Sequence, residues 1–104
     1  MANFLLVYHG GSMPETPEEG VKVMQAWTDW LGTIGDRLVD AGNPVSQVKT
    51  IAADGSVSDG GTNASTGYSV IKADSIDAAV ALAKGCPVLQ GGASVEVAET
   101  FEVM

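Results

Sequence analysis

The sequence contains a single histidine, His9, and this is the residue best suited to chemistry near neutral pH. An unperturbed imidazole changes its charge near pH 6.5, so it can both accept and release a proton. His9 ends an apolar run and precedes Gly10 and Gly11, which predicts a side chain at the rim of a cleft. We predict His9 as the acid or base and Asp59 as its orienting partner. The alternatives are a rim histidine with a structural hydrogen bond and a turn aspartate that binds its own loop backbone.

Three further side chains are candidates for contact with a small ligand. They are the hydroxyl groups of Ser12 and Tyr68 and the indole of Trp30. Trp30 flanks the apolar stripe of the long predicted helix, from which it could reach a pocket edge or a second copy of the chain. Solvation or a local hydrogen bond is the alternative for the two hydroxyl groups, and core packing is the alternative for the indole.

The sequence predicts neither a metal ion nor a cofactor. The one histidine and the one cysteine lie far apart, and no carboxylate cluster completes a ligand set. Cys86 lacks an internal disulfide partner and precedes Pro87, just past a predicted helix end. A packed, unreactive thiol is therefore the favoured interpretation, with a reactive thiol as the alternative.

The charge balance argues against two classes of partner. Thirteen acidic residues against five basic ones give a net charge of −8, and the five cations are scattered. Such a surface repels nucleic-acid phosphates and anionic membranes alike, so we expect neither as a partner. The apolar run 4–8 is too short to cross a membrane and lacks the basic lead of a signal peptide, so we expect a cytoplasmic protein.

The 104 residues fit one domain, 1–104, whose first half contains the clearest local signals. The run 3–9 does not alternate, which predicts a central strand buried on both faces. Thr16, Pro17 and Glu19 form a capping box that opens a helix extending to about residue 41. The apolar residues of this helix recur at spacings of three and four and form one stripe. They are Met24, Trp27, Leu31, Ile34 and Leu38.

The second half predicts further strands and one short helix. We expect a strand over 45–53, a tight turn at Asp54–Gly55 and a short return strand over 56–58. A strand over 67–73, a helix over 77–84 capped by Asp74 or Ser75, and a last strand over 94–103 follow. This order predicts an α+β, ferredoxin-like βαββαβ fold, an antiparallel sheet with two helices on one face.

Two helices leave the second face of such a sheet uncovered. Because the run 4–8 is apolar on both faces, a monomer would expose several hundred Å² of apolar surface, more than soluble monomers usually do. We therefore expect a homodimer in which sheet faces sheet about a two-fold axis.

The placed elements resemble the YCII-related family, and within it the branch named for an Asp-Gly-Pro-Phe (DGPF) motif. The segments that carry the resemblance are 4–8, 38–42, 57–60, 67–75, 81–87 and 91–97. The resemblance covers essentially the whole chain and implies a ferredoxin-like fold assembled as a dimeric α/β barrel.

This chain departs from the pattern of that branch. It has Asp59-Gly60-Gly61-Thr62, so Gly61 and Thr62 replace the proline and phenylalanine of the motif. The family histidine lies at the start of the long helix, where this chain has none, so that role is not carried over to His9.

Two functions follow as hypotheses, and the sequence does not decide whether the protein is an enzyme. The first is a homodimeric domain that binds a small organic ligand in a cleft between sheet and helices, and catalyses proton transfer or elimination on it. The resemblance implies this chemistry, because isomerases and dehydrohalogenases occur among dimeric α/β-barrel proteins. The alternative is a non-catalytic dimerisation or regulatory module, since similar domains are implied to occur beside transcription-initiation factors.

Overall fold

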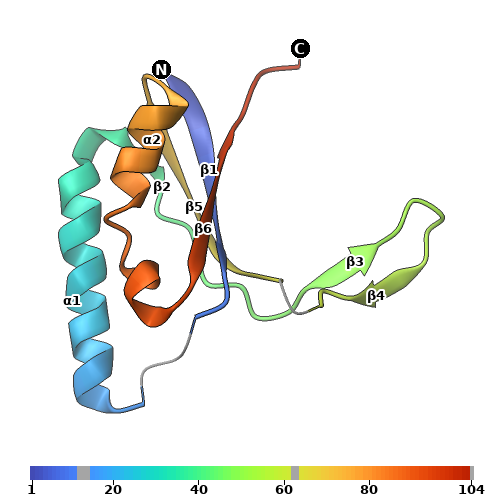
Figure 1. The fold of residues 1–104 in the computed structure, drawn as a ribbon, viewed down its shortest axis with the longest axis horizontal. Coiled ribbons are helices and arrows are strands. Elements are labelled where there is room, and N and C mark those ends of the chain that lie inside the picture. Colours follow the sequence, from blue (N-terminus) through green and yellow to red (C-terminus); the bar gives the residue numbers. More distant parts are fainter. Residues whose placement is uncertain (12–14, 62–63, 104) are drawn as a thin grey trace.

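The computed structural model describes residues 1–11, 15–61 and 64–103 (Figure 1). Its strands are β1 (Ala2–His9), β2 (Leu38–Asp40), β3 (Lys49–Ile51), β4 (Val57–Asp59), β5 (Ser65–Ala73) and β6 (Ser94–Glu99). Its helices are α1 (Pro17–Ile34) and α2 (Ile76–Ala83), with 3₁₀ turns η1 (Gly35–Arg37) and η2 (Pro87–Gly91). None of the helices in these ranges is long and apolar enough to cross a membrane.

Four strands form an antiparallel sheet in the order β2-β5-β1-β6, with β1 and β5 at its centre. The two α-helices lie on the same side of this sheet (Figure 1). This arrangement confirms the predicted α+β, ferredoxin-like fold.

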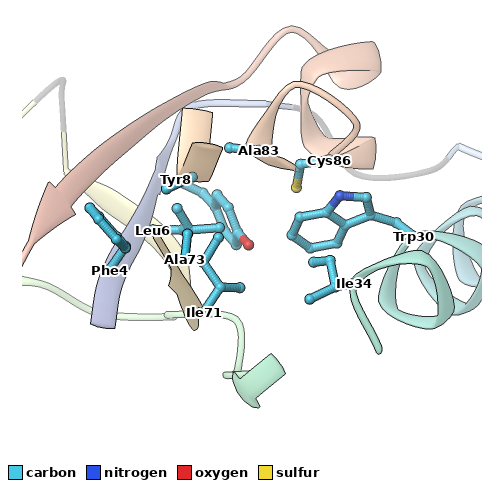
Figure 2. Close-up of a cluster of buried hydrophobic side chains, with 10 residues drawn as sticks. Phe4, Leu6, Tyr8, Trp30, Ile34, Ile71, Ala73, Ala83 and Cys86 are labelled. Atoms are coloured by element: carbon cyan, nitrogen blue, oxygen red, sulfur yellow. The ribbon is translucent and has the colours of Figure 1, made fainter. Parts of the chain in front are cut away.

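The core lies between the sheet and the helices (Figure 2). From β1, Phe4, Leu6 and Tyr8 alternate into it and are nearly or completely buried. Ten residues form the buried cluster: Phe4, Leu6, Tyr8, Trp30, Ile34, Ile71, Ala73, Ala79, Ala83 and Cys86. The residues between them on β1, Leu5 and Val7, are only half-buried. Within one chain, therefore, β1 is fully covered on one face only.

Helix α1 begins where the sequence predicts. Thr16 accepts a hydrogen bond from the backbone N–H of Glu19 at 3.1 Å, and Pro17 is the first helical residue. The predicted end near residue 41 is wrong, because the helix ends at Ile34. Gly35 adopts a φ of +58°, a conformation that glycine reaches without a Cβ penalty. Met24, predicted on the inward stripe, is 68% exposed.

The segment after α1 forms a sheet strand earlier than predicted. Strand β2 pairs with β5, whereas the predicted strand over 45–53 reduces to β3, which is not part of the four-stranded sheet. Strand β3 pairs with β4 in a separate hairpin, closed by the predicted turn at Asp54 and Gly55. This hairpin projects from the side of the sheet opposite the helices (Figure 1).

Helix α2 is capped by Ser75, one of the two predicted caps, whose hydroxyl accepts a hydrogen bond from the N–H of Ala78 at 3.1 Å. The last strand, β6, ends at Glu99, earlier than the predicted residue 103. Thr100 continues along β1 through a hydrogen bond from its N–H to the carbonyl of Asn3 at 2.9 Å.

Candidate functional site

The sheet presents one face to the helices, and no helix of the described residues covers the other, which we call the open face. Successive side chains of a strand point to opposite faces, and directly opposed residues of an antiparallel pair share a face. The register of β1 with its neighbours therefore assigns the members of the open face. They are Asn3, Leu5, Val7 and His9 from β1, Tyr68, Val70 and Lys72 from β5, and Ser94, Glu96 and Ala98 from β6.

His9 lies at one end of the open face and contacts a carboxylate there. Its Nε2 is 3.2 Å from Oε1 of Glu96. The His9 side chain is only 14% exposed, while that of Glu96 is 67% exposed. A carboxylate in this position orients the imidazole ring. Because Glu96 is well solvated, the pair contributes little to folding stability.

Tyr68 lies on the same face as the His9–Glu96 pair. Tyr68 on β5 and Glu96 on β6 are the two cross-strand neighbours of Val7. His9 is two residues further along β1, so all three polar side chains surround Val7 on one face. The structure thus brings together the predicted base and one predicted ligand-binding residue on one face of the sheet.

The other predicted site residues lie elsewhere. Asp59 on β4 contacts Lys49 across the hairpin, with its Oδ1 2.6 Å from the lysine Nζ, so the carboxylate beside His9 is that of Glu96. Trp30 is buried in the core and donates its indole N–H to the carbonyl of Leu82 at 3.0 Å, which fits the packing alternative. Ser12 lies outside the described residues.

Comparison with known proteins identifies a solved structure that has the same fold. No protein-family model matches this sequence, and no curated protein matches it. The solved structure is that of 5-chloro-2-hydroxyhydroquinone dehydrochlorinase (TftG) from Burkholderia phenoliruptrix AC1100, in complex with 2,5-dihydroxybenzoquinone. It superposes with a TM-score of 0.55 at 16% identity, over 96% of this chain and 93% of the dehydrochlorinase. At this identity the likeness establishes the fold alone, and membership of the YCII-related family stays a prediction.

The sequence analysis missed Glu96 as the partner of His9. The alternation of residues 94–98 does place Glu96 on the side opposite Val95 and Val97. Only the register of β6 against β1, in which Val7 opposes Glu96, brings that side next to His9. No local signal in the sequence specifies that register.

A concave surface lies on the helix side of the sheet. It is an apolar groove of about 330 Å³ between α2, η2 and β6, and Lys84 provides its one charged side chain. Val80, Ala83, Leu89, Val95 and Val97 complete its lining. This groove occupies the predicted position between sheet and helices, yet its lining includes none of the predicted site residues.

Two ionisable groups, Tyr8 and Cys86, are buried on the core side of the sheet. The Tyr8 hydroxyl donates to Oγ of Ser69 at 2.7 Å, and Ser69 donates in turn to the carbonyl of Ala41 at 2.7 Å. Burial raises the pKa of Tyr8 well above its usual range, and burial likewise raises the pKa of the Cys86 thiol. A buried, protonated thiol is a poor nucleophile, which favours the packing interpretation of Cys86.

Across residues 1–11, 15–61 and 64–103, no three His, Cys, Asp or Glu side chains group as metal ligands do.

Proposed function

We propose that this protein binds a small organic molecule at the His9 end of the open face and that His9 transfers a proton on it. Glu96 takes the orienting role that the sequence analysis gave to Asp59. The contact of 3.2 Å between His9 and Glu96, at one end of the open face, is the observation that carries the proposal.

The reaction that suits this pair is proton abstraction followed by elimination. His9 takes a proton from carbon, the C–H electron pair forms a new double bond, and the leaving group departs with its bonding electrons. The Glu96 carboxylate stabilises the imidazolium formed in this step. Tyr68 is placed on the same face to hold a polar group of the ligand. A net charge of −8 favours a neutral or weakly acidic ligand over a multiply charged anion.

The fold comparison supports this reaction class by analogy. The solved neighbour is a dehydrochlorinase bound to a dihydroxybenzoquinone, so the same fold holds a small cyclic molecule in that protein. For this chain we propose the same general chemistry and membership of the YCII-related family, both as inferences by resemblance.

We further propose that the active form is a homodimer that associates through the open face. Leu5, Val7, Val70 and Ala98 give this face an apolar centre. The chain exposes 7239 Å², whereas a compact monomer of 10.6 kDa exposes roughly 5,500 Å². The excess is larger than the roughly 800 Å² that each partner buries in a standard protein interface. His9 would then lie at the rim between the two sheets, where a small molecule can enter.

The test is turnover of a panel of small enolisable and halogenated cyclic molecules by matched variants. We expect H9A to lower turnover by at least about 100-fold, the usual contribution of a general acid or base. E96Q should lower it by about tenfold, because it removes the charge next to His9 and keeps the side-chain size. E99Q alters a carboxylate of the same strand on the other face, and D59N alters the hairpin carboxylate. Both should stay within about twofold of the parent protein, since neither group contacts His9.

One further variant locates the ligand. K84M removes the charge of the groove on the helix side and should leave binding unchanged. If K84M abolished protection against thermal unfolding by the ligand while H9A did not, the ligand would occupy the groove and the proposal would be wrong. Loss of activity in D59N together with full activity in E96Q would also contradict it.

The alternative, a non-catalytic dimerisation module, is favoured by the apolar centre of the open face, which suits protein contact without chemistry. It predicts a stable dimer, no turnover of any panel member and no thermal protection by a metabolite library. That combination would overturn the enzyme proposal and support the module.

A further inference from the structure

We infer that the β3–β4 hairpin is an arm that packs against a second copy of this chain. The inference rests on the proposed dimer and adds a contact that the open face does not provide. We call residues 49–59 the arm.

The arm is not supported by its own subunit along its strands. It forms a separate two-stranded sheet, and all six residues of β3 and β4 are exposed. A two-stranded hairpin alone in water is marginally stable at best. The radius of gyration is 15.0 Å, against about 13 Å for a compact chain of this length, in keeping with a segment that projects.

One face of the arm carries an exposed apolar pair where solvent would favour polar residues. Ile51 and Val57 are directly opposed in the register, and they are 72% and 63% exposed. Lys49 and Asp59, two positions away on the same face, form an ion pair beside them. The opposite face carries Thr50 and Ser58, so the arm is amphipathic, although its apolar pair is exposed among the residues that the structure describes. An apolar centre beside a polar margin is the usual composition of a contact surface.

The position of the arm indicates which partner covers that pair. The arm projects on the side of the sheet opposite the helices, which is also the side of the open face (Figure 1). A second copy seated on the open face therefore lies alongside the arm. A two-fold axis makes the contact reciprocal, so each arm reaches the other subunit.

The first test measures dimer dissociation by sedimentation equilibrium over a range of concentrations. We expect the double variant I51S/V57S to raise the dissociation constant at least tenfold. The matched control is V21S/M24S, which replaces two α1 side chains that are 70% and 68% exposed on the helix side. It should leave the dissociation constant within twofold. An equal change in both variants, or no change in the arm variant, would overturn the inference. Circular dichroism and the thermal midpoint check that each variant is folded.

The second test detects the contact directly. A photoreactive phenylalanine analogue at position 51 is incorporated into ¹⁵N-labelled chains, which are mixed with unlabelled chains and irradiated. Mass spectrometry should find cross-linked peptides that join a labelled chain to an unlabelled one. Cross-links confined to single chains would refute the arm contact.

A third variant separates this inference from the dimer itself. V70K places a charge in the apolar centre of the open face and should make the chain monomeric. If V70K dissociates the dimer while I51S/V57S does not weaken it, the arm inference fails and the open-face dimer stands. If the parent chain is monomeric at all concentrations, both fail, while the effect of H9A on turnover still decides the proposed chemistry.

Discussion

Replacing Ser69 with alanine should destabilise the fold more than replacing Tyr8 with phenylalanine, although the two residues share one hydrogen bond. Ser69 is 1% exposed and accepts from the Tyr8 hydroxyl while donating to the carbonyl of Ala41, both at 2.7 Å. Ser69→Ala therefore removes the acceptor of the buried Tyr8 hydroxyl and the donor to the part-buried carbonyl of Ala41. Tyr8→Phe removes the donor itself, and Ser69 keeps its bond to Ala41.

The magnitudes follow from this asymmetry. A buried polar group left without its partner costs about 1–3 kcal/mol, whereas one hydrogen bond contributes a net 0.5–1.5 kcal/mol, in rough terms. We expect Ser69→Ala to lower the free energy of unfolding by about 2 kcal/mol and Tyr8→Phe by about 1 kcal/mol. At about 4–8 °C per kcal/mol, Ser69→Ala should lower the thermal midpoint by about 8–16 °C. The double variant should be less destabilised than the sum of the two single variants. The reason is that it has no Tyr8 hydroxyl that could lose its hydrogen-bond acceptor.

Urea denaturation of the parent, the two single variants and the double variant at one protein concentration measures this cycle. A fixed concentration is needed because dimerisation would otherwise alter the apparent stability. Two results would refute the reasoning. One is a Ser69→Ala variant at least as stable as Tyr8→Phe, and the other is additivity of the two changes to within about 0.3 kcal/mol.

Three further outcomes are expected. Burial raises the pKa of Tyr8 above 10.0, its value in the unfolded chain, so stability should fall as the pH rises above 10, by at most about 1.4 kcal/mol per pH unit. Denaturant titrations between pH 8 and 11 should show a shallower fall for Tyr8→Phe. Gly42 has a φ of +80°, and an added Cβ would overlap the carbonyl oxygen of Tyr68. Gly42→Ala should therefore lower the free energy of unfolding by more than about 2 kcal/mol in urea titrations, and a smaller loss would contradict that geometry. Thr16→Ala removes the cap of α1 and should cost about 1 kcal/mol by the same measurement, with Thr33→Ala on the exposed side of the helix as the control.

The parts of the fold that short sequence signals determine were predictable. Thr16 and Pro17 start α1 because a side-chain cap and a fixed φ act within one turn. The hairpin turn at Asp54 and Gly55 is likewise local, since Gly55 takes a φ of +90° and Asp54 accepts from the N–H of Ser56. The predicted order of the main strands and helices then leaves few topologies to consider.

The end of α1 could not be predicted in the same way. Leu38 continues the spacing of the apolar stripe, so the pattern alone favours a longer helix. The chain instead leaves the helix at Gly35, and Leu38 pairs with Ile71 of β5. That pairing is a contact between segments more than thirty residues apart, and tertiary pairing overrides local propensity here.

The candidate site depends on non-local geometry even more. His9 could be selected from the sequence because it is the one histidine and ends a strand. Its partner could not, because Glu96 is separated from it by 87 positions. In the sequence, Asp59 is the stronger candidate for this partner, since it begins the segment that resembles the DGPF motif. The hairpin carries it away from the sheet strands and pairs it with Lys49.

The register of β6 against β1 therefore decides what each surface of this protein can do. Val95 and Val97 line the groove on the helix side, while Glu96 between them faces His9 on the open face. A slip of one residue would exchange the two sets, because side chains alternate with a period of two. Glu96 would then lie in the apolar groove, and His9 would face valine. The pairing of Leu6 with Val97 in the buried core opposes such a slip, since it would place Glu96 against Phe4, Leu6 and Tyr8. Packing on one face of β6 thus fixes which polar side chains lie on the other.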